Sequence, residues 1–405
     1  MKKLLTTVFI ILAVILTFAD ALKFLPKNYS TIIYVPDVPK AYDTFKTTPI
    51  GQTLLSDNGL GLESLVFSVV EQQLLSLKYT KDDFDLFMKE MLLATDNDGN
   101  LTVVLGPVKN PTKIKKILEG FLENETLKKV KFVENYFILS DVAVGGGKVP
   151  ANFQNMLKGN LGITYTNIVD GKIMFEGYGY IKAENNGITL YQKIDAKSQE
   201  AVNLLKDLQA KKAVDILNDK NVGGDLFVFV NREIPESLRK SVLDPFISAL
   251  NLGNIKLSGV MYMSFDLANA FSQFMNEDSQ ANTSQNASIS GYSVVYGTGF
   301  KMPAEVKKYV TIGSERYGLL ESENGFESYI LIKNDRMITY TINPSKYKPG
   351  DRTFITSNYD PKYFAGIFLN FEPLINTTLG KKVKSSAIFI NYVEGNSIIQ
   401  RGVIK

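Results

Sequence analysis

The chain has 405 residues, 45% of them hydrophobic, with 45 Lys and Arg against 42 Asp and Glu, and it contains neither His nor Cys. So balanced a charge offers no broad basic field for nucleic acid, whose binding depends on neutralising many phosphates. The lack of His and Cys excludes disulfides, thiolate metal sites and imidazole-based catalysis, and we expect no cofactor.

The first 21 residues have the features of a signal peptide. Lys2 and Lys3 precede an uncharged apolar run, residues 4–18, and Ala-Asp-Ala at 19–21 is an A-x-A cleavage pattern. The run is shorter than the roughly 20 residues of a membrane-spanning helix, so we expect cleavage after Ala21. The mature chain is then periplasmic or extracellular, with no further membrane span. The alternative is that the segment is kept as an anchor.

Next along the chain, two distant stretches resemble each other. Residues 102–118, TVVLGPVKNPTKIKKIL, align with residues 293–310, SVVYGTGFKMPAEVKKYV, when one gap of a single residue is allowed. Flanking segments repeat in the same order, at separations of roughly 200 residues, which is the size of a domain. These flanking matches pair residues 31–45 with 226–240, and residues 161–168 with 365–372.

The repetition indicates a tandem duplication with pseudo-symmetric halves. We divide the chain into a signal peptide at 1–21, a first half at 22–222 and a second half at 223–405, with the boundary near Gly223. Helical patterns interrupt the strand patterns without alternating strictly with them. We therefore predict an α+β fold, in which each half is a mainly antiparallel sheet with proline-started helices.

Individual elements follow from local signals. Pro111 and Pro303 are expected in the first turns of matching helices, and residues 61–93 and 198–217 are also expected to be helical. The strand-rich regions carry turn residues typical of hairpins. These turns are Glu134-Asn135, Asp170-Gly171, residues 185–187, residues 323–325 and Asn334-Asp335. The polar segment 277–288 is expected to be a surface loop.

The mature start, FLPKNYSTIIYVPDVPKAYDTFKTTPIG, together with the later strand, proline-started helix and hairpin, resembles exported bacterial proteins that are grouped as a domain of unknown function. The resemblance covers most of the mature chain and implies a location in the cell envelope. It brings no catalytic residue.

Three short motifs offer chemistry, and each has a structural alternative. Ser237 and Lys240 form S-x-x-K, but the SDN at residues 56–58 precedes it and K-T-G is missing, so we interpret Ser237 as a helix-start residue. Residues 96–100 lack the spacing of a calcium loop and are expected to form a turn. Residues 145–148 lack the helix that follows a phosphate loop, and we expect a flexible loop.

Lys109 and Lys301 are the candidate binding residues. Each precedes a proline at the expected start of a helix, where an ammonium group and unpaired backbone N–H groups together favour an anion. The alternative is a pair of solvated surface lysines. Tyrosines such as Tyr178 and Tyr180 are expected to pack across strands.

Two functions remain open from the sequence. The first is a non-catalytic binding or scaffold protein of the envelope, whose partner, another envelope component or an apolar small molecule, is held in a cleft or on a concave sheet. The second is a hydrolase that uses Asp and Glu or a Ser-Lys pair, which requires these groups to converge in a cleft.

Overall fold

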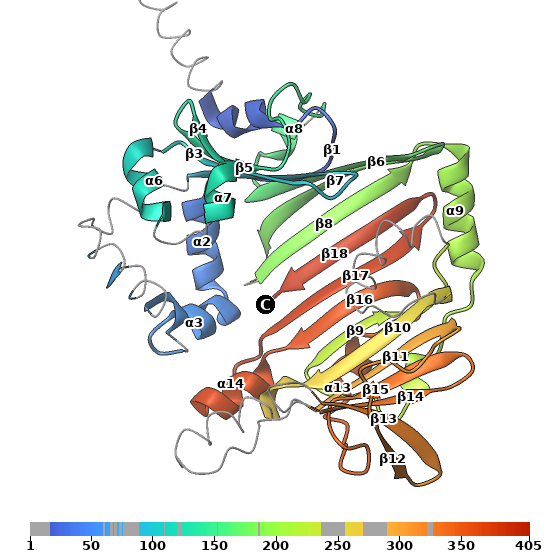
Figure 1. Ribbon diagram of the computed structural model, residues 1–405. Coiled ribbons are helices and arrows are strands. Elements are labelled where there is room, and N and C mark those ends of the chain that lie inside the picture. The colour runs from blue at the N-terminus through green and yellow to red at the C-terminus, as the bar shows by residue number, and fades with distance from the viewer. Residues whose placement is uncertain are drawn as a thin grey trace, which may run out of the picture. The chain divides into compact units, whose positions relative to one another are not determined.

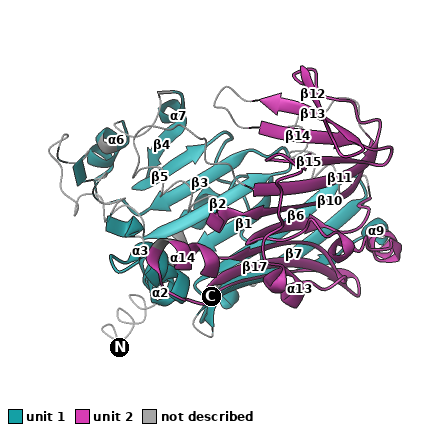
Figure 2. Ribbon diagram, turned by 90° about the horizontal axis from the view of Figure 1, so that it is seen from below, with its two compact units in different colours: residues 1–201 teal, residues 202–405 magenta. Residues whose placement is uncertain are grey.

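The computed structural model describes residues 17–59, 61–64, 68, 71–72, 75, 89–108, 110–119, 124–151, 153–184, 187–235, 256–269, 290–321 and 327–405. The chain forms two compact units, residues 1–201 and 202–405 (Figure 2). The division lies within helix α9 (Gln199–Ala210), earlier than the boundary that the sequence indicates near Gly223. In each unit the strands pair antiparallel, which confirms an α+β fold with mainly antiparallel strands.

Unit 1 pairs its strands in the order β4-β5-β3-β2-β1-β6-β7-β8 (Figure 1). Its strands are β1 (Tyr29–Val35), β2 (Glu90–Asp96), β3 (Leu101–Gly106), β4 (Val130–Val133), β5 (Tyr136–Ser140), β6 (Gly162–Asp170), β7 (Ile173–Glu184) and β8 (Gly187–Ala196). Its helices are η1 (Thr17–Phe24), α2 (Val38–Thr47), α3 (Pro49–Leu55), α6 (Pro111–Glu119), α7 (Asn124–Lys129) and α8 (Phe153–Met156).

Unit 2 pairs its strands in the order β12-β13-β14-β15-β11-β10-β9-β16-β17-β18. Its strands are β9 (Leu226–Val230), β10 (Lys256–Asp266), β11 (Ser290–Thr298), β12 (Lys308–Ile312), β13 (Glu315–Glu321), β14 (Glu327–Ile332), β15 (Arg336–Tyr340), β16 (Tyr363–Asn370), β17 (Ser386–Glu394) and β18 (Ser397–Ile404). Its helices are η2 (Ile216–Asn218), α13 (Thr353–Asn358) and α14 (Glu372–Leu379).

The two strand orders share a common pattern. In unit 1 the strands β1, β2 and β3 are neighbours, and β4 and β5 form a hairpin whose second strand, β5, pairs with β3. The chain then returns to the other side of β1, where β6, β7 and β8 are added. In unit 2 the strands β9, β10 and β11 are neighbours, β14 and β15 form the hairpin, and β16, β17 and β18 are added beside β9. Unit 2 differs by its additional strands β12 and β13.

The core of unit 1 lies on one face of its central strands. Ile32, Leu92 and Val104 come from β1, β2 and β3, and they pack with Leu25, which directly follows η1, and Phe153 of α8. These side chains alternate with half-buried neighbours along each strand, as the two-residue period of a strand requires. A second cluster forms where α6 packs against β5 through Ile114, Leu118 and Phe137.

The core of unit 2 is rich in tyrosine and phenylalanine. Phe227, Phe229 and Phe368 from β9 and β16 are fully buried, with ring centroids 5.3 to 6.0 Å apart. On neighbouring strands, the hydroxyls of Tyr262 and Tyr292 donate to Oδ2 of Asp219, at 2.7 and 2.6 Å. Buried hydroxyls need such an acceptor, because an unpaired one is costly inside a protein.

Several predicted turns and helix starts are confirmed. Glu134 and Asn135 both have positive φ values, 48° and 65°, in the tight turn between β4 and β5. Gly171 has a φ of 58° in the turn between β6 and β7. Pro111 is the first residue of α6, and α2 begins with a proline in its first turn, where the missing N–H breaks no helical bond.

Three helical predictions are wrong in part. The helix expected from Pro303 is a turn, because Val306 packs against Ile330 and Met337 and the chain then enters β12. The predicted helix 61–93 overlaps β2, whose apolar residues pair with β1 and β3. The helix predicted for 198–217 ends at Ala210, since the chain turns there to run beside the segment that follows β9. The turns at 185–186 and 323–325 and the loop 277–288 lie outside the described residues.

Candidate functional site

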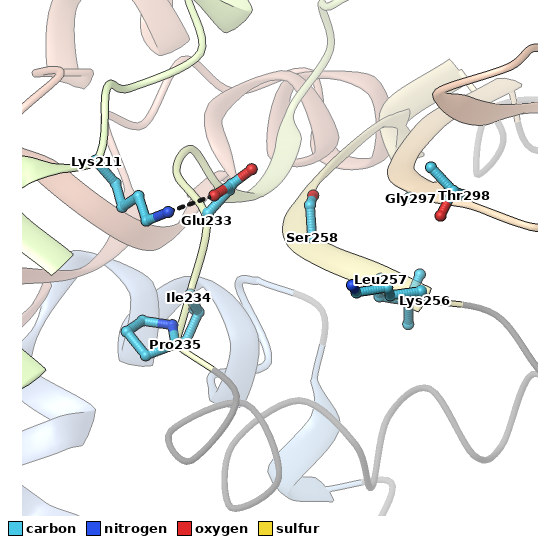
Figure 3. Close-up of a pocket in the computed structure, with 9 residues that line it drawn as sticks. All are labelled: Lys211, Glu233, Ile234, Pro235, Lys256, Leu257, Ser258, Gly297 and Thr298. Atoms are coloured by element: carbon cyan, nitrogen blue, oxygen red, sulfur yellow. Dashed lines mark hydrogen bonds and ion pairs between the residues drawn. The ribbon is translucent and has the colours of Figure 1, made fainter. Parts of the chain in front are cut away.

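An open hollow of unit 2 lies at one end of β9, β10 and β11 and is the candidate site (Figure 3). It consists of two adjoining spaces of about 430 and 450 Å³, a size that suits a small molecule. Residues shared by both spaces are Lys211, Glu233, Ser258, Gly297 and Thr298.

An irregular stretch of β10 lines the hollow. The pairing of β10 with β11 shifts between Leu257 and Met261, and Gly259 lies in the shifted stretch with a φ of 90°. The chain that leaves β9 runs beside this stretch, where the Ile234 N–H donates to the Ser258 carbonyl at 3.2 Å. A Cβ at position 259 would lie 3.0 Å from the nitrogen of Ile234, so glycine allows both the φ value and the close approach.

Ammonium groups gather around the hollow. Lys211 pairs with Glu233 at 2.8 Å, and this hydrogen bond and charge raise the pKa of Lys211, so that it is a cation at neutral pH. Lys212 and Lys256 line the hollow from exposed positions. Asp335 lines it as well, and the hydrogen bond from its neighbour Arg336 lowers the pKa of Asp335. The site thus combines mixed charges with an excess of lysine.

The hydroxyl group of Ser258 is already engaged by backbone groups of β10 and β11. Its Oγ donates to the carbonyl of Tyr296 at 3.2 Å and accepts from the N–H of Val260 at 3.2 Å. The Tyr296 ring is held in turn by Arg336, which donates to its hydroxyl at 3.0 Å and stacks 4.7 Å from the ring centroid. With Lys211 protonated beside Glu233, this arrangement does not resemble a serine activated by a neutral base.

Apolar side chains complete the lining. Ile234, Leu257 and Val260 are buried and Val214 is half-buried. A ligand that fills the hollow therefore meets hydrocarbon next to ammonium groups. Polar groups that fix orientation within an apolar lining are the usual composition of a small-molecule site.

The predicted anion residues are not part of this hollow. Lys301 is exposed in the turn 301–307, so no helix N-terminus stands beside it. Lys109 lies outside the described residues, as do Ser237 and Lys240. The anion contact stays a prediction, but at Lys301 it lacks the helix on which it was based.

The other motifs have structural roles where they are described. Asp96 accepts from the N–H groups of Asp98 and Asn100 at 3.0 and 2.9 Å, which confirms a turn between β2 and β3. In residues 145–148, the Gly147 N–H donates to the Leu25 carbonyl at 3.0 Å. Tyr178 and Tyr180 pack across strands, as expected, against Tyr165 and Tyr191.

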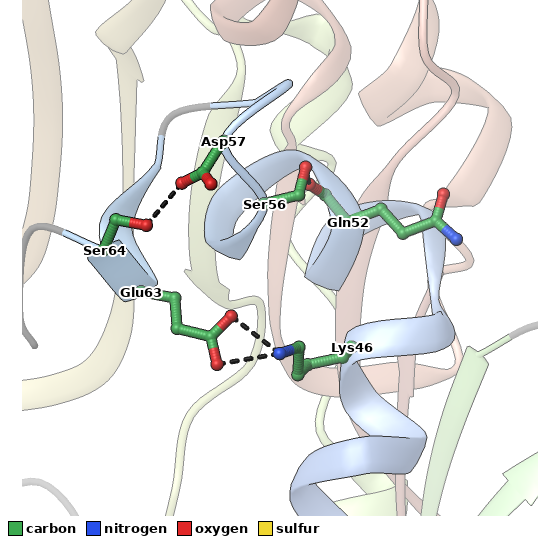
Figure 4. A network of polar contacts seen from close by, with 6 residues as sticks. All are labelled: Lys46, Gln52, Ser56, Asp57, Glu63 and Ser64. Atoms are coloured by element: carbon green, nitrogen blue, oxygen red, sulfur yellow. Dashed lines mark hydrogen bonds and ion pairs between the residues drawn. The ribbon is translucent and has the colours of Figure 1, made fainter. Parts of the chain in front are cut away.

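The SDN motif belongs to a polar network at α2 and α3 (Figure 4). Ser56 ends α3 and donates to the Gln52 carbonyl at 2.5 Å, while Ser64 donates to Asp57. Nearby, Lys46 binds both carboxylate oxygens of Glu63 at 2.7 Å. These bonds tie the ends of short helices together, and they account for the motif without catalysis.

Sequence reasoning missed the hollow, although two signals of it were present. A glycine inside the strand pattern KLSGVMYMSF indicates a bulge, and Lys211-Lys212 directly follows a helix. What could not be foreseen is that the segments around 211, 233, 258, 297 and 335 meet at one end of the sheet.

The comparisons with known proteins found no match: no family model, no curated protein and no solved structure is similar to this chain. The resemblance to exported bacterial proteins of unknown function stays a prediction. Among the described residues, no helix is both long and apolar enough to span a membrane, and no group of three or more carboxylates is placed to hold a metal ion.

Proposed function

We propose that the chain is an exported, non-catalytic binding protein of the cell envelope, built by tandem duplication of one α+β unit. The duplication is supported by the agreement of two independent patterns. The three sequence matches fall on strands with the same place in the two strand orders, namely β1 with β9, β3 with β11, and β6 with β16. Chance resemblance of strand residues gives no reason for this topological agreement.

The connections between strands support the same proposal. A 3₁₀ helix precedes the first strand of each unit, η1 before β1 and η2 before β9. Leu22 of η1 and Ile216 of η2 each pack into the core of their unit. The connection before the returning strand carries a short helix with a buried side chain in each unit, Phe153 in α8 and Ile355 in α13. The copies then diverged, since α6 and α7 of unit 1 occupy the chain interval that β12 and β13 occupy in unit 2.

The hollow of unit 2 is the observation that supports binding. Its three lysines and buried apolar side chains suit a small amphiphilic molecule with an anionic group, such as a carboxylate or phosphate. Within the hollow, the engaged hydroxyl of Ser258 and the protonated state of Lys211 favour a binding role over a hydrolase built on these two residues. Export and cleavage after Ala21 belong to the proposal and are supported by the N-terminal sequence pattern.

The test is native mass spectrometry of the protein purified from its own envelope, followed by solvent extraction of any bound molecule. We expect an acidic amphiphile to be retained by the wild-type protein and lost from a variant with Lys212→Ala and Lys256→Ala. The matched control carries Lys346→Ala and Lys348→Ala, two exposed lysines of unit 2 away from the hollow. Retention of nothing, or equal retention by both variants, contradicts the proposal.

A further inference from the structure

A buried carboxylate lies beside the predicted cleavage junction. Glu90, the first residue of β2, is only 4% exposed. Its Oε2 accepts from the backbone N–H of Ala21 at 3.3 Å and from the hydroxyl of Tyr34 at 3.2 Å, and its Oε1 accepts from the hydroxyl of Tyr136 at 3.5 Å. A carboxylate is rarely this buried unless donors converge on it.

The chain that follows the junction is part of the core. Leu22 and Phe24 are 2% and 6% exposed, Leu25 is fully buried, and all three pack in the main core cluster of unit 1. Removal of residues 1–21 therefore does not leave a loose terminus on the surface. It creates the new end next to the core cluster and to Glu90, whose carboxylate offers the new ammonium group a counter-charge.

We propose that Glu90 is the binding site for the α-ammonium group that appears on Leu22 when residues 1–21 are removed; the inference rests on the proposed export of the protein. The endopeptidase of the export pathway adds water across the bond between the Ala21 carbonyl carbon and the Leu22 nitrogen. The released segment carries the new carboxylate, and Leu22 carries the new amine, which takes up a proton.

The position of Ala21 in η1 brings the new amine close to Glu90. The Ala21 nitrogen already contacts Glu90, and the Leu22 nitrogen is the next one along η1, in which the rise is about 2 Å per residue. The neutral amide donor of the precursor is replaced by a cation with several N–H groups. Charge-assisted bonds of this kind are shorter and stronger than bonds between neutral groups.

Processing then becomes a source of stability. In the mature chain the buried pair of Leu22 and Glu90 joins η1 to β2, whereas a chain with residues 19–21 attached has only an amide at the same place. Breaking a buried ion pair by removing one partner is strongly destabilising, because it leaves an uncompensated charge. The effect of Glu90 on stability should depend on the form of the N-terminus.

The pH dependence separates this ammonium group from its neighbours. In the described part of the chain, the titratable groups near Glu90 include Tyr34 on β1, Tyr136 on β5, and Lys23, which pairs with Glu134 and faces the Tyr136 ring. An α-amino group has an ordinary pKa of about 7.7 to 8.0, a range that lies apart from those of ordinary Tyr, Lys and Glu side chains. A nearby carboxylate favours the charged form of an amine, so we expect the stabilisation to be present near pH 7 and to be lost as the pH rises above the range in which the amine titrates.

The experiment compares two chains, residues 22–405 and residues 19–405, each with Glu90 and with Glu90→Gln. At about pH 7 we expect Glu90→Gln to lower the melting temperature of the shorter chain by roughly 10 °C and that of the longer chain by no more than about 5 °C. At about pH 9.5 the difference between the chains should shrink. Equal shifts in both chains at both pH values overturn the inference.

A measurement on the unmutated protein guards against a variant that does not fold. In the folded chain 22–405, labelling of the α-amine by cyanate should be at least about tenfold slower than in urea, since reaction requires local opening. Labelling at the unfolded rate overturns the inference. The intact mass of the exported protein separates the two proposals. A mature chain that begins elsewhere than Leu22 overturns both this inference and the proposed cleavage. Failure to find a ligand in the hollow leaves this inference intact.

Discussion

Replacement of Asp219 by alanine should destabilise unit 2 because it removes a single acceptor on which two buried tyrosines depend. Asp219 Oδ2 accepts from the hydroxyl groups of Tyr262 and Tyr292, and both tyrosines are 3% exposed. They stand on β10 and β11, two neighbouring strands of the central sheet of unit 2. Asp219→Ala leaves both hydroxyls without this acceptor in the core.

The magnitude follows from the two bonds. A hydrogen bond to a charged acceptor contributes about 1.5 to 3 kcal/mol to stability, and a donor left unpaired in the core costs about 1 to 3 kcal/mol. Asp219 itself is half-buried, so water offsets part of the loss. We expect the free energy of unfolding of unit 2 to fall by about 3 kcal/mol, which for a unit of this size lowers its melting temperature by roughly 10 °C.

The assay is a double-mutant cycle measured by urea unfolding. The chain contains no Trp, so tyrosine emission reports on its unfolding, and hydrogen exchange in β10 and β11 assigns the transition to unit 2. With Tyr262→Phe and Tyr292→Phe already in place, Asp219→Ala should cost less than about 1 kcal/mol, a coupling of roughly 2 kcal/mol. If the changes add within about 0.5 kcal/mol, the proposed network does not hold the core together.

Three further changes test other parts of unit 2. Gly259→Ala should lower the free energy of unfolding in urea by about 2 to 3 kcal/mol, and Gly313→Ala by only about 1 kcal/mol. Both glycines have positive φ, but only Gly259 has neighbours that a Cβ would meet. Equal losses would contradict the close packing at Gly259. By calorimetry, Phe368→Ala should lower the free energy of unfolding by about 3 to 5 kcal/mol and Ile367→Ala by less than about 1 kcal/mol. Phe368 is fully buried, whereas its neighbour Ile367 is 43% exposed. Similar losses would contradict the assignment of these two side chains to opposite faces of β16. Burial first, and then the bond to Asp219, raise the pKa of Tyr292, so its stabilisation should be complete below about pH 10 and fall as the pH rises toward that pKa. Tyrosinate absorbance should therefore match in wild type and Tyr292→Phe until the protein unfolds, and a difference already near pH 10 would refute this.

Local signals predicted the hairpins well. Glu134-Asn135 and Asp170-Gly171 specify their turns because only residues that tolerate positive φ fit such tight connections. The start of α6 at Pro111 follows from the same kind of local restriction. These features depend on backbone geometry within a few residues, so the surrounding fold changes them little.

Predictions failed where neighbours in space decided the structure. The lysine-rich stretch after Pro303 has a helical pattern like that after Pro111, yet Val306 is taken up by the core beside Ile330 and Met337 and the chain continues as a strand. Residues 91–94 are apolar without a clear period, and their pairing with β1 and β3 makes them a strand. An apolar run of this length fits either structure until its partners are known.

The sequence by itself determined the class of fold, the turns and helix starts with strong local preferences, and the three matched segments. Each of these depends on residues that are close together along the chain. The tertiary structure alone decided the strand order of each unit, the hollow at the ends of β9, β10 and β11, the two tyrosines on Asp219, and the nearness of Glu90 to Ala21. Each of these depends on residues far apart in the chain, such as 21 and 90 or 211 and 297. Such residues meet only when burial of the apolar strand faces brings their strands into one sheet, and no local preference encodes that meeting.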